Sequence, residues 1–221
     1  GWLTDLGYTS QVFDQAGLTA ESLRPFKLVI WDDLGSAEGG IGTAEVDLFQ
    51  SLTNAGIPLY FIGDDLAYTT TLLPEPHSTR WSHLIRLKDF VPGAAIPTFQ
   101  IFAPGHPLLV GPYGSVSAPF TLGGDTDRDE HIDFADVVGI NLLAHCNPVT
   151  KARRVTQNWL PTAAPTPQDQ AAIVFKNSVA WLMASNLRPD VAVTQTPGRN
   201  TVLLGSQVEV EILITNSGPG A

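Results

Sequence analysis

Two apolar segments, each ending in a pair of aspartates, constrain the fold of this chain more than any other feature. They are "FKLVIWDD" (26–33) and "IPLYFIGDD" (57–65). Continuous apolar runs of this length are typical of strands covered on both faces, as in parallel sheets flanked by helices. Between them, Thr43 as N-cap and Gly56 as the stop predict a connecting helix. The sequence therefore predicts an α/β fold, a mostly parallel sheet with helices on both faces.

Further elements follow the same alternation of strand and helix. A short strand is expected at 10–14, and a second at 152–160, where polar and apolar residues alternate. A helix is expected to start at a Thr166–Pro167 cap and to end near 186–189. Between 70 and 125, frequent prolines predict loops and short edge strands packed on the sheet.

Composition narrows the possible partners and compartments. The chain has 12 Lys and Arg against 22 Asp and Glu, a net charge of −10, which argues against a nucleic-acid partner. Its apolar runs are shorter than the ~20 residues of a membrane-spanning helix, so no span is expected in this segment. The single cysteine, Cys146, excludes an intrachain disulfide and is expected to be a buried structural thiol.

The sequence changes character after Pro189. "DVAVTQTPGRNTVLLGSQVEVEILITNSGPGA" is rich in Val, Thr and Ile and alternates with period two, which is typical of an all-β module. We therefore divide the chain into an α/β domain at 1–188 and a partial β module at 189–221. A stretch this short is not expected to be stable alone.

An acidic stretch, "GGDTDRDEHIDFADVVGINLLAHC" (123–146), carries the strongest metal pattern. Oxygen ligands at positions 1, 3, 5, 7, 9 and 12 are the spacing of an EF-hand calcium loop. The candidate ligands in that register are Asp125, Asp127, Asp129, His131 through its carbonyl, Asp133 and Asp136. A helix is expected to follow at 134–145. The alternative is a solvated acidic loop whose aspartates cap the next element.

This pattern resembles the calcium loops of dockerins and related exported proteins, which also carry glycine before position 1, here Gly124. Two departures matter. Position 6 is Glu130 in place of glycine, and one copy is present where a dockerin has two, which removes most of the case for cohesin binding. A saturated oxygen cage leaves no position for substrate, so the expected cofactor, calcium, would have an architectural role.

The aspartates at the strand ends form a second candidate site. Asp32, Asp33, Asp64 and Asp65 follow the two apolar strands, and open α/β sheets bind ligands at the carboxyl ends of their strands. The four carboxylates could line a ligand cleft. Alternatively, they cap the following turns and helices.

Four stretches resemble the flavodoxin-like domains related to class I glutamine amidotransferases, as found in large bacterial exported proteins. They are "LGYTSQVFD", "LVIWDDLG", "PLYFIGDDLAY" and "AIVFKNSVAWLM". The resemblance implies a strand ahead of "LGY", in the middle of the sheet, that is missing here. It also implies a nucleophilic cysteine at the turn after a central strand, yet the matching turn is "IGDDLA".

The stretches "PDVAVTQTP" and "VLLGSQVEVEILITNSGPGA" resemble the opening strands of the immunoglobulin-like repeats of bacterial surface proteins. That resemblance implies a bacterial extracellular or cell-surface location. Flanking domains of a longer chain, or neighbouring copies, would then be partners through unpaired β edges.

The function expected from these features is a non-catalytic, calcium-stabilised structural, adhesion or assembly domain. The alternatives are an accessory or carbohydrate-binding domain of an exported hydrolase that uses the Asp32/Asp65 cleft, and a degenerate amidotransferase-like enzyme.

Overall fold

The computed structural model describes residues 2–33, 40–95, 98–122, 127–159, 168–184, 191–197 and 210–216. The chain divides into two compact units, 1–185 and 186–221. The boundary expected after residue 188 falls among residues 185–190, outside the described part. Among the described helices, none combines the length and apolarity that a bilayer crossing requires.

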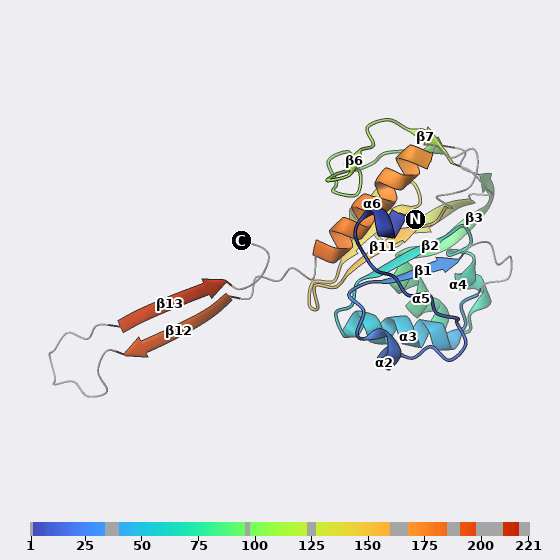
Figure 1. The fold of residues 1–221 in the computed structure, drawn as a ribbon. Coiled ribbons are helices and arrows are strands. Elements are labelled where there is room, and N and C mark those ends of the chain that lie inside the picture. Colours follow the sequence, from blue (N-terminus) through green and yellow to red (C-terminus); the bar gives the residue numbers. More distant parts are fainter. Residues whose placement is uncertain are drawn as a thin grey trace. The chain divides into compact units, whose positions relative to one another are not determined.

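A five-stranded sheet forms the centre of the first unit (Figure 1). Its strand order is β1 (Val29–Asp33), β2 (Leu59–Gly63), β11 (Arg153–Gln157), β10 (Leu142–Cys146) and β9 (Val137–Gly139). β1, β2 and β11 are parallel, whereas β10 runs antiparallel to both of its neighbours. The α/β class expected from the sequence is thus confirmed, and the arrangement fits a flavodoxin-like fold, but the sheet is mixed where a mostly parallel one was expected, because β9 and β10 pair antiparallel.

Helices cover both faces of this sheet. α6 (Gln168–Ala184) packs on one face, where Tyr60, Val155 and Leu142 meet its Val174 and Val179 in a single apolar cluster. Figure 1 shows α6 on one side of the sheet and α3 (Thr43–Asn54) and α5 (His77–Ile85) on the other.

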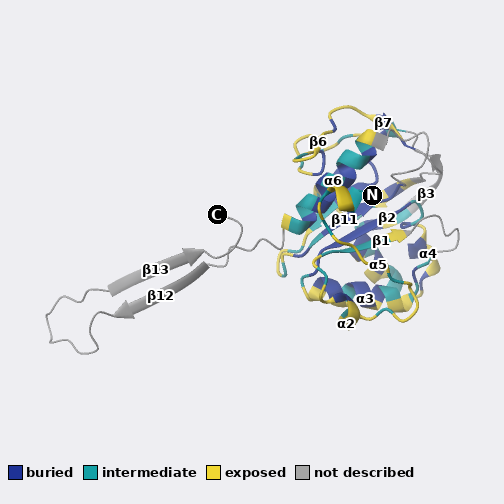
Figure 2. Cartoon of the chain, viewed as in Figure 1, coloured by how far each residue is buried: buried dark blue, intermediate teal, exposed yellow. Residues whose placement is uncertain are grey.

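The second face is dominated by aromatic rings. The Phe61 ring of β2 lies edge-on to Phe49 of α3, with centroids 5.1 Å apart, and to Trp81 of α5, at 5.2 Å. All three side chains are at most 1% exposed. Figure 2 shows that burial is concentrated along the sheet and on the inward sides of the helices. The apolar run of β2 is therefore buried on both faces, as a central strand requires, whereas Val29, Ile30 and Trp31 of β1 are half-buried.

Most predicted elements of the sheet are confirmed, with shifted boundaries. Strands lie within both aspartate-ending segments, and β11 lies within 152–160. α3 ends before Gly56, whose φ is +81°. Its N-cap, however, is Gly42 and not Thr43: the Glu45 carboxylate accepts a hydrogen bond from the Gly42 N–H at 2.8 Å. The described part of α6 begins at Gln168. The cap expected at 166–167 lies outside the described residues.

Two expectations were wrong in kind. Residues 10–14 do not form a strand, and they pair with no other segment in the described part. The helix expected at 134–145 is absent: η1 (Phe134–Asp136), a single 3-10 turn, leads into β9 and β10.

The reversal between β9 and β10 explains the second error. Asn141 adopts a left-handed φ of +54°, which breaks a helix and turns the chain back on itself. The expected apolar stripe of a helix is instead divided by strand alternation: Val138 and Leu142 face the α6 side, and Val137 faces α5. Phe134, at the start of that stripe, is 83% exposed.

The proline-rich region contains helices as well as short strands. α4 (Thr69–Leu72) and α5 precede β3 (Leu87–Ala95), which pairs antiparallel with β8 (Asp127–His131). The remaining pieces are α1 (Trp2–Asp5), α2 (Ala20–Leu23), β4 (Thr98–Phe99), β5 (Val110–Gly111), β6 (Gly114–Ser115) and β7 (Phe120–Thr121). The buried residues Trp81, Leu84 and Ile85 have the spacing of a helix. The prolines of this region led to a prediction of loops and edge strands instead.

In the second unit, β12 (Val191–Pro197) pairs antiparallel with β13 (Val210–Asn216). The strand content expected for this part is confirmed. Two strands do not identify an immunoglobulin-like module, which stays a prediction.

Candidate functional site

The carboxyl ends of the three parallel strands meet at one edge of the sheet. Asp33 lies beside Gly63 in register, and Asp64 and Asp65 follow directly. Asp32 is exposed, and Asp64 and Asp65 are half-buried. For Asp33, only the backbone position is described. The fold thus brings the strand-end aspartates of both segments to the edge where α/β sheets bind ligands.

Asn158, directly after β11, ties this edge together. Its side-chain oxygen accepts a hydrogen bond from the Leu66 N–H at 3.0 Å, and its amide nitrogen donates to Asp129 Oδ2 at 2.8 Å. Its backbone N–H donates to the Asn141 carbonyl at 2.8 Å. Asn158 is 1% exposed. One buried amide therefore joins the turn after β2, strand β8 and the turn between β9 and β10.

The same turn is held from the opposite side. The Trp81 indole N–H donates to the Leu66 carbonyl at 2.9 Å, so both backbone groups of Leu66 are bonded to buried side chains. Between β2 and β11, the Tyr60 hydroxyl donates to Gln157 Oε1 at 2.6 Å. Burial raises the pKa of Tyr60, and the nearby charge of Asp32 raises it further. The phenol is neutral at physiological pH and cannot serve as a base.

The turn after β2 is where the amidotransferase resemblance would place a cysteine. Here it holds Asp64 and Asp65, and the cysteine of the chain lies elsewhere. Cys146 pairs with Arg153 at the amino end of β11, which is the opposite edge of the sheet. Its thiol is exposed, so the expectation of a buried thiol was wrong. Cys146 and His145 are successive strand residues and point to opposite faces.

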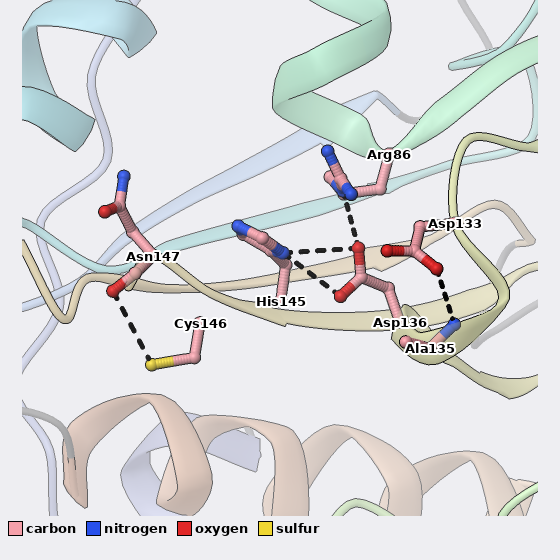
Figure 3. A network of polar contacts seen from close by, with 7 residues as sticks. All are labelled: Arg86, Asp133, Ala135, Asp136, His145, Cys146 and Asn147. Atoms are coloured by element: carbon pink, nitrogen blue, oxygen red, sulfur yellow. Dashed lines mark hydrogen bonds and ion pairs between the residues drawn. The ribbon is translucent and has the colours of Figure 1, made fainter. Parts of the chain in front are cut away.

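A cluster of charges lies on the α5 side of the sheet (Figure 3). The Arg86 guanidinium Nε lies 2.6 Å from Asp136 Oδ2, and His145 Nδ1 lies 3.1 Å from Asp136 Oδ1. These three side chains are only 13–17% exposed. Arg154, which pairs with His145 across β10 and β11, is 7% exposed. Sequence patterns did not reveal that Asp136 pairs with Arg86 and His145, because these contacts depend on the packing of β10 against the end of α5.

Electrostatics in the cluster depend on Asp136. Burial alone would raise the pKa of its carboxyl, but hydrogen bonds from His145 and Arg86, and their charges, leave the pKa lowered overall. Burial, followed by repulsion from Arg86, lowers the pKa of the Arg154 guanidinium to about 10, while Asp136 opposes the shift. The carboxylate is therefore the counterion of Arg86 at the end of α5, and it also contacts His145 of β10.

The described members of the predicted calcium loop do not form one ligand set. Asp129, 3% exposed in strand β8, bonds to Asn158, and Asp133 caps η1 by accepting from the Ala135 N–H at 3.0 Å. Asp136 is paired with Arg86 and His145 as above. His131 lies in β8 opposite Leu87. Asp125 lies outside the described residues, and only the backbone of Asp127 is described.

The loop conformation expected for 127–131 was therefore wrong. Those residues form a ladder with β3, and in a strand neighbouring side chains point to opposite faces. Within the part of the chain that the structure covers, no group of three or more His, Cys, Asp or Glu is close enough to share a metal ion. Calcium binding by 125–136 stays a prediction.

No family model matches the chain, and no curated protein matches it. Among solved structures it resembles a protein described as a "putative gmp synthase subunit a protein" from Thermoplasma acidophilum. The identity is 13%, the match covers 84% of this chain and 86% of that one, and the TM-score is 0.49. This similarity carries no conclusion about function.

Proposed function

We propose that the chain is a non-catalytic structural or assembly domain of a large exported bacterial protein. The observation that carries the proposal is the bonding of Asn158. Its amide links the β2 turn to β8, at the edge where an α/β enzyme would place reacting groups. Groups that are fixed to one another in this way maintain the fold, and are not available to a substrate.

The charge cluster supports the same proposal. Asp136 joins Arg86, at the end of α5, to His145 on β10, two elements that are far apart in the sequence. A largely buried carboxylate that binds both Arg86 and His145 is an internal brace. The extracellular location, the immunoglobulin-like identity of the second unit and the calcium ion are further parts of the proposal, supported so far by sequence patterns alone.

The experiment compares the thermal stability of Asp32→Asn, Asp64→Asn and Asp65→Asn with that of the parent chain. Residues that serve binding or catalysis often lower the stability of the fold, so replacing them raises the melting temperature. Replacing a residue that stabilises the fold lowers the melting temperature. We expect unchanged or lower melting temperatures for the three variants. A rise of several degrees in any of them would favour a ligand site at this edge.

A second candidate function, carbohydrate binding, is favoured by one observation. Asp32 lies in the lining of a hollow of about 670 Å³, together with the aromatic residues Phe13, Phe26 and Trp31. Apolar rings with a few polar groups are typical of small-ligand sites. Titration with mono- and oligosaccharides, monitored by Trp fluorescence, tests this candidate, with Asp32→Asn as the matched variant.

A further inference from the structure

Arg154 is a buried cation that has no bonded partner in the part of the chain that the structure describes. Its side chain belongs to a residue that is 7% exposed, and its Nε atom is shielded from solvent without a hydrogen bond. No described carboxylate forms an ion pair with its guanidinium group. Burying a charge without a counterion costs free energy, so buried charges in proteins are paired. The charge of Arg154 therefore requires a compensating group.

The register of the sheet places Arg154 next to the charge cluster. Arg154 lies on β11 and is the partner of His145 on β10 and of Leu59 on β2. Residues that are directly opposite on neighbouring strands have their side chains on the same face. Leu59 belongs to the apolar core between the sheet and helices α3 and α5. The Arg154 side chain therefore lies on the face where Arg86 and Asp136 meet.

The carboxylate of Asp136 is already bonded to other side chains (Figure 3). Its Oδ2 atom lies 2.6 Å from Arg86 Nε and 3.2 Å from His145 Nδ1, and its Oδ1 atom lies 3.1 Å from the same nitrogen. Both carboxylate oxygens are thus used by Arg86 and His145. Asp136 and Arg154 interact through their charges, but no hydrogen bond joins them.

The cluster holds more positive than negative charge. Arg86 and Arg154 are close enough to repel each other, and this repulsion adds to burial in lowering the pKa of Arg154 to about 10. Both guanidinium groups are still protonated at physiological pH, so two positive charges face one carboxylate and leave +1. Neither Glu130 nor Asp133 supplies the missing charge, because Glu130 pairs with Lys88 and Asp133 caps η1.

The compensating group must be small. The side chains of Arg86, Asp136 and His145 are only 13–17% exposed, which leaves a ligand at the cluster little room and little water. A guanidinium group is weakly hydrated and presents its N–H donors in one plane. A halide ion suits such donors, since it carries a single charge and accepts hydrogen bonds from any direction.

We propose that a chloride ion binds between the guanidinium groups of Arg154 and Arg86 and supplies the missing negative charge. Arg154 would donate through its buried Nε, and Arg86 through the Nη groups that its contact with Asp136 does not use. The ion would join β11 to the end of α5, as Asp136 joins η1 to the same helix. The proposal concerns an anionic component of the cluster, and stands whether or not the chain is a structural domain.

The test compares the melting temperature in sodium chloride and in sodium gluconate at equal ionic strength, with chelator present. Both salts screen the surface charges equally, but gluconate is too large for the cluster, and the chelator removes calcium. An ion that binds only the folded state stabilises it by RT ln(1 + [L]/Kd). We expect a melting temperature a few degrees higher in chloride, and a rise with the logarithm of the chloride concentration.

Arg154→Met is the test variant, and Arg153→Met is its matched control. Methionine removes the charge and keeps a flexible apolar side chain at the buried position. Arg154→Met should fold and lose the dependence on chloride. Arg153 points to the opposite face, where its Cζ lies 4.7 Å from the centroid of the Trp181 ring. Arg153→Met loses the same charge and should keep the dependence.

A second measurement needs no variant. Crystals grown in sodium bromide reveal the bound halide by its anomalous scattering. We expect a bromide peak within hydrogen-bonding distance of Arg154 Nε.

Three outcomes would overturn the proposal. Equal melting temperatures in chloride and gluconate would mean that water alone compensates Arg154. A chloride dependence that survives in Arg154→Met would place the ion elsewhere on the chain. Bromide crystals without a peak at Arg154 would exclude a halide at the cluster.

Discussion

The Arg86 guanidinium and the Asp136 carboxylate form a largely buried ion pair, with Nε and Oδ2 2.6 Å apart and side-chain exposures of 14% and 13%. Arg86 ends α5 in a left-handed conformation, with φ +65°, and Asp136 lies in η1. The pair therefore joins the helical layer to the edge of the sheet, and His145 adds a second contact to the same carboxylate.

Asp136→Asn should destabilise the fold strongly, because it leaves Arg86 buried without its counterion. Loss of one partner of a buried pair costs about 3–5 kcal/mol. Chemical denaturation measures the difference. Lys88→Gln is the control: Lys88 and Glu130 are 69% and 53% exposed, and such surface pairs contribute about 0–1 kcal/mol.

The same variant tests the role of calcium. If Asp136 acts as a brace, the loss of stability is equal in excess calcium and in chelator. If residues 125–136 bind calcium, the ion adds RT ln(1 + [L]/Kd) to the parent chain, about 2.7 kcal/mol at a hundredfold excess over Kd. A calcium-dependent rise in melting temperature that Asp136→Asn abolishes would restore the metal-loop hypothesis.

Acid should remove the contribution of Asp136. The pKa of Asp136 is lowered in the folded state, so the unfolded chain binds the proton more tightly. The free energy of unfolding therefore decreases as the pH decreases. The contribution is present above the unfolded value, about 3.9, and is lost as pH falls through the lower folded pKa. Unfolding free energies below pH 5 should decline more steeply for the parent than for Asp136→Asn. Equal slopes would contradict the assignment.

His106 should give a second pH dependence at milder acidity. Burial, followed by the charge of Arg153, lowers its pKa, and its Nδ1 accepts from the Leu108 N–H at 3.2 Å. The folded state thus favours neutral imidazole, and stability is lost as pH falls below the unfolded value of about 6.5. His106→Asn should reduce the slope between pH 7 and 5. A slope as steep as that of the parent would refute this.

Asn158→Ala should cost about 1–3 kcal/mol for each buried group left without its partner, beginning with the Leu66 N–H. The matched control is Asn54→Ala, because Asn54 makes its hydrogen bond with Gln50 at an exposed site. If both variants were equally stable, the strand-end network would not be structural, and the proposed function would lose its main support.

Gly139→Ala should also destabilise, by about 1–3 kcal/mol, through overpacking. A Cβ at residue 139 would lie 2.2 Å from Phe99 Cζ and 2.9 Å from the Gln100 carbonyl oxygen. Gly105→Ala is the control, because a Cβ there meets nothing within 4 Å. Melting temperatures of the two variants measure the difference.

β1 and β2 could be predicted because each lies in a continuous apolar run bounded by turn residues, a pattern typical of strands covered on both faces. β9 and β10 were missed because "VVGINLLAH" fits helical spacing as well as two strands. The deciding feature is the left-handed turn at Asn141, which sequence periodicity does not reveal.

Part of the candidate site could also be predicted from the sequence, and part could not. The strand-end aspartates were found because chain direction alone brings them to one edge. Asn158, Arg86, Arg154 and His145 were missed because their contacts depend on tertiary packing between distant segments. The acidic pattern at 125–136 is local in the sequence. Pairing with β3 makes residues 127–131 a strand and not the loop that the pattern predicted.

Cys146 is the one cysteine of the chain, it is exposed, and it lies at the sheet edge opposite Asp65. A maleimide dye or a nitroxide therefore attaches at a single known place, without mutagenesis and away from the strand-end aspartates. The signal of that one label then reports on the end of the sheet opposite the strand-end aspartates, in the unaltered sequence.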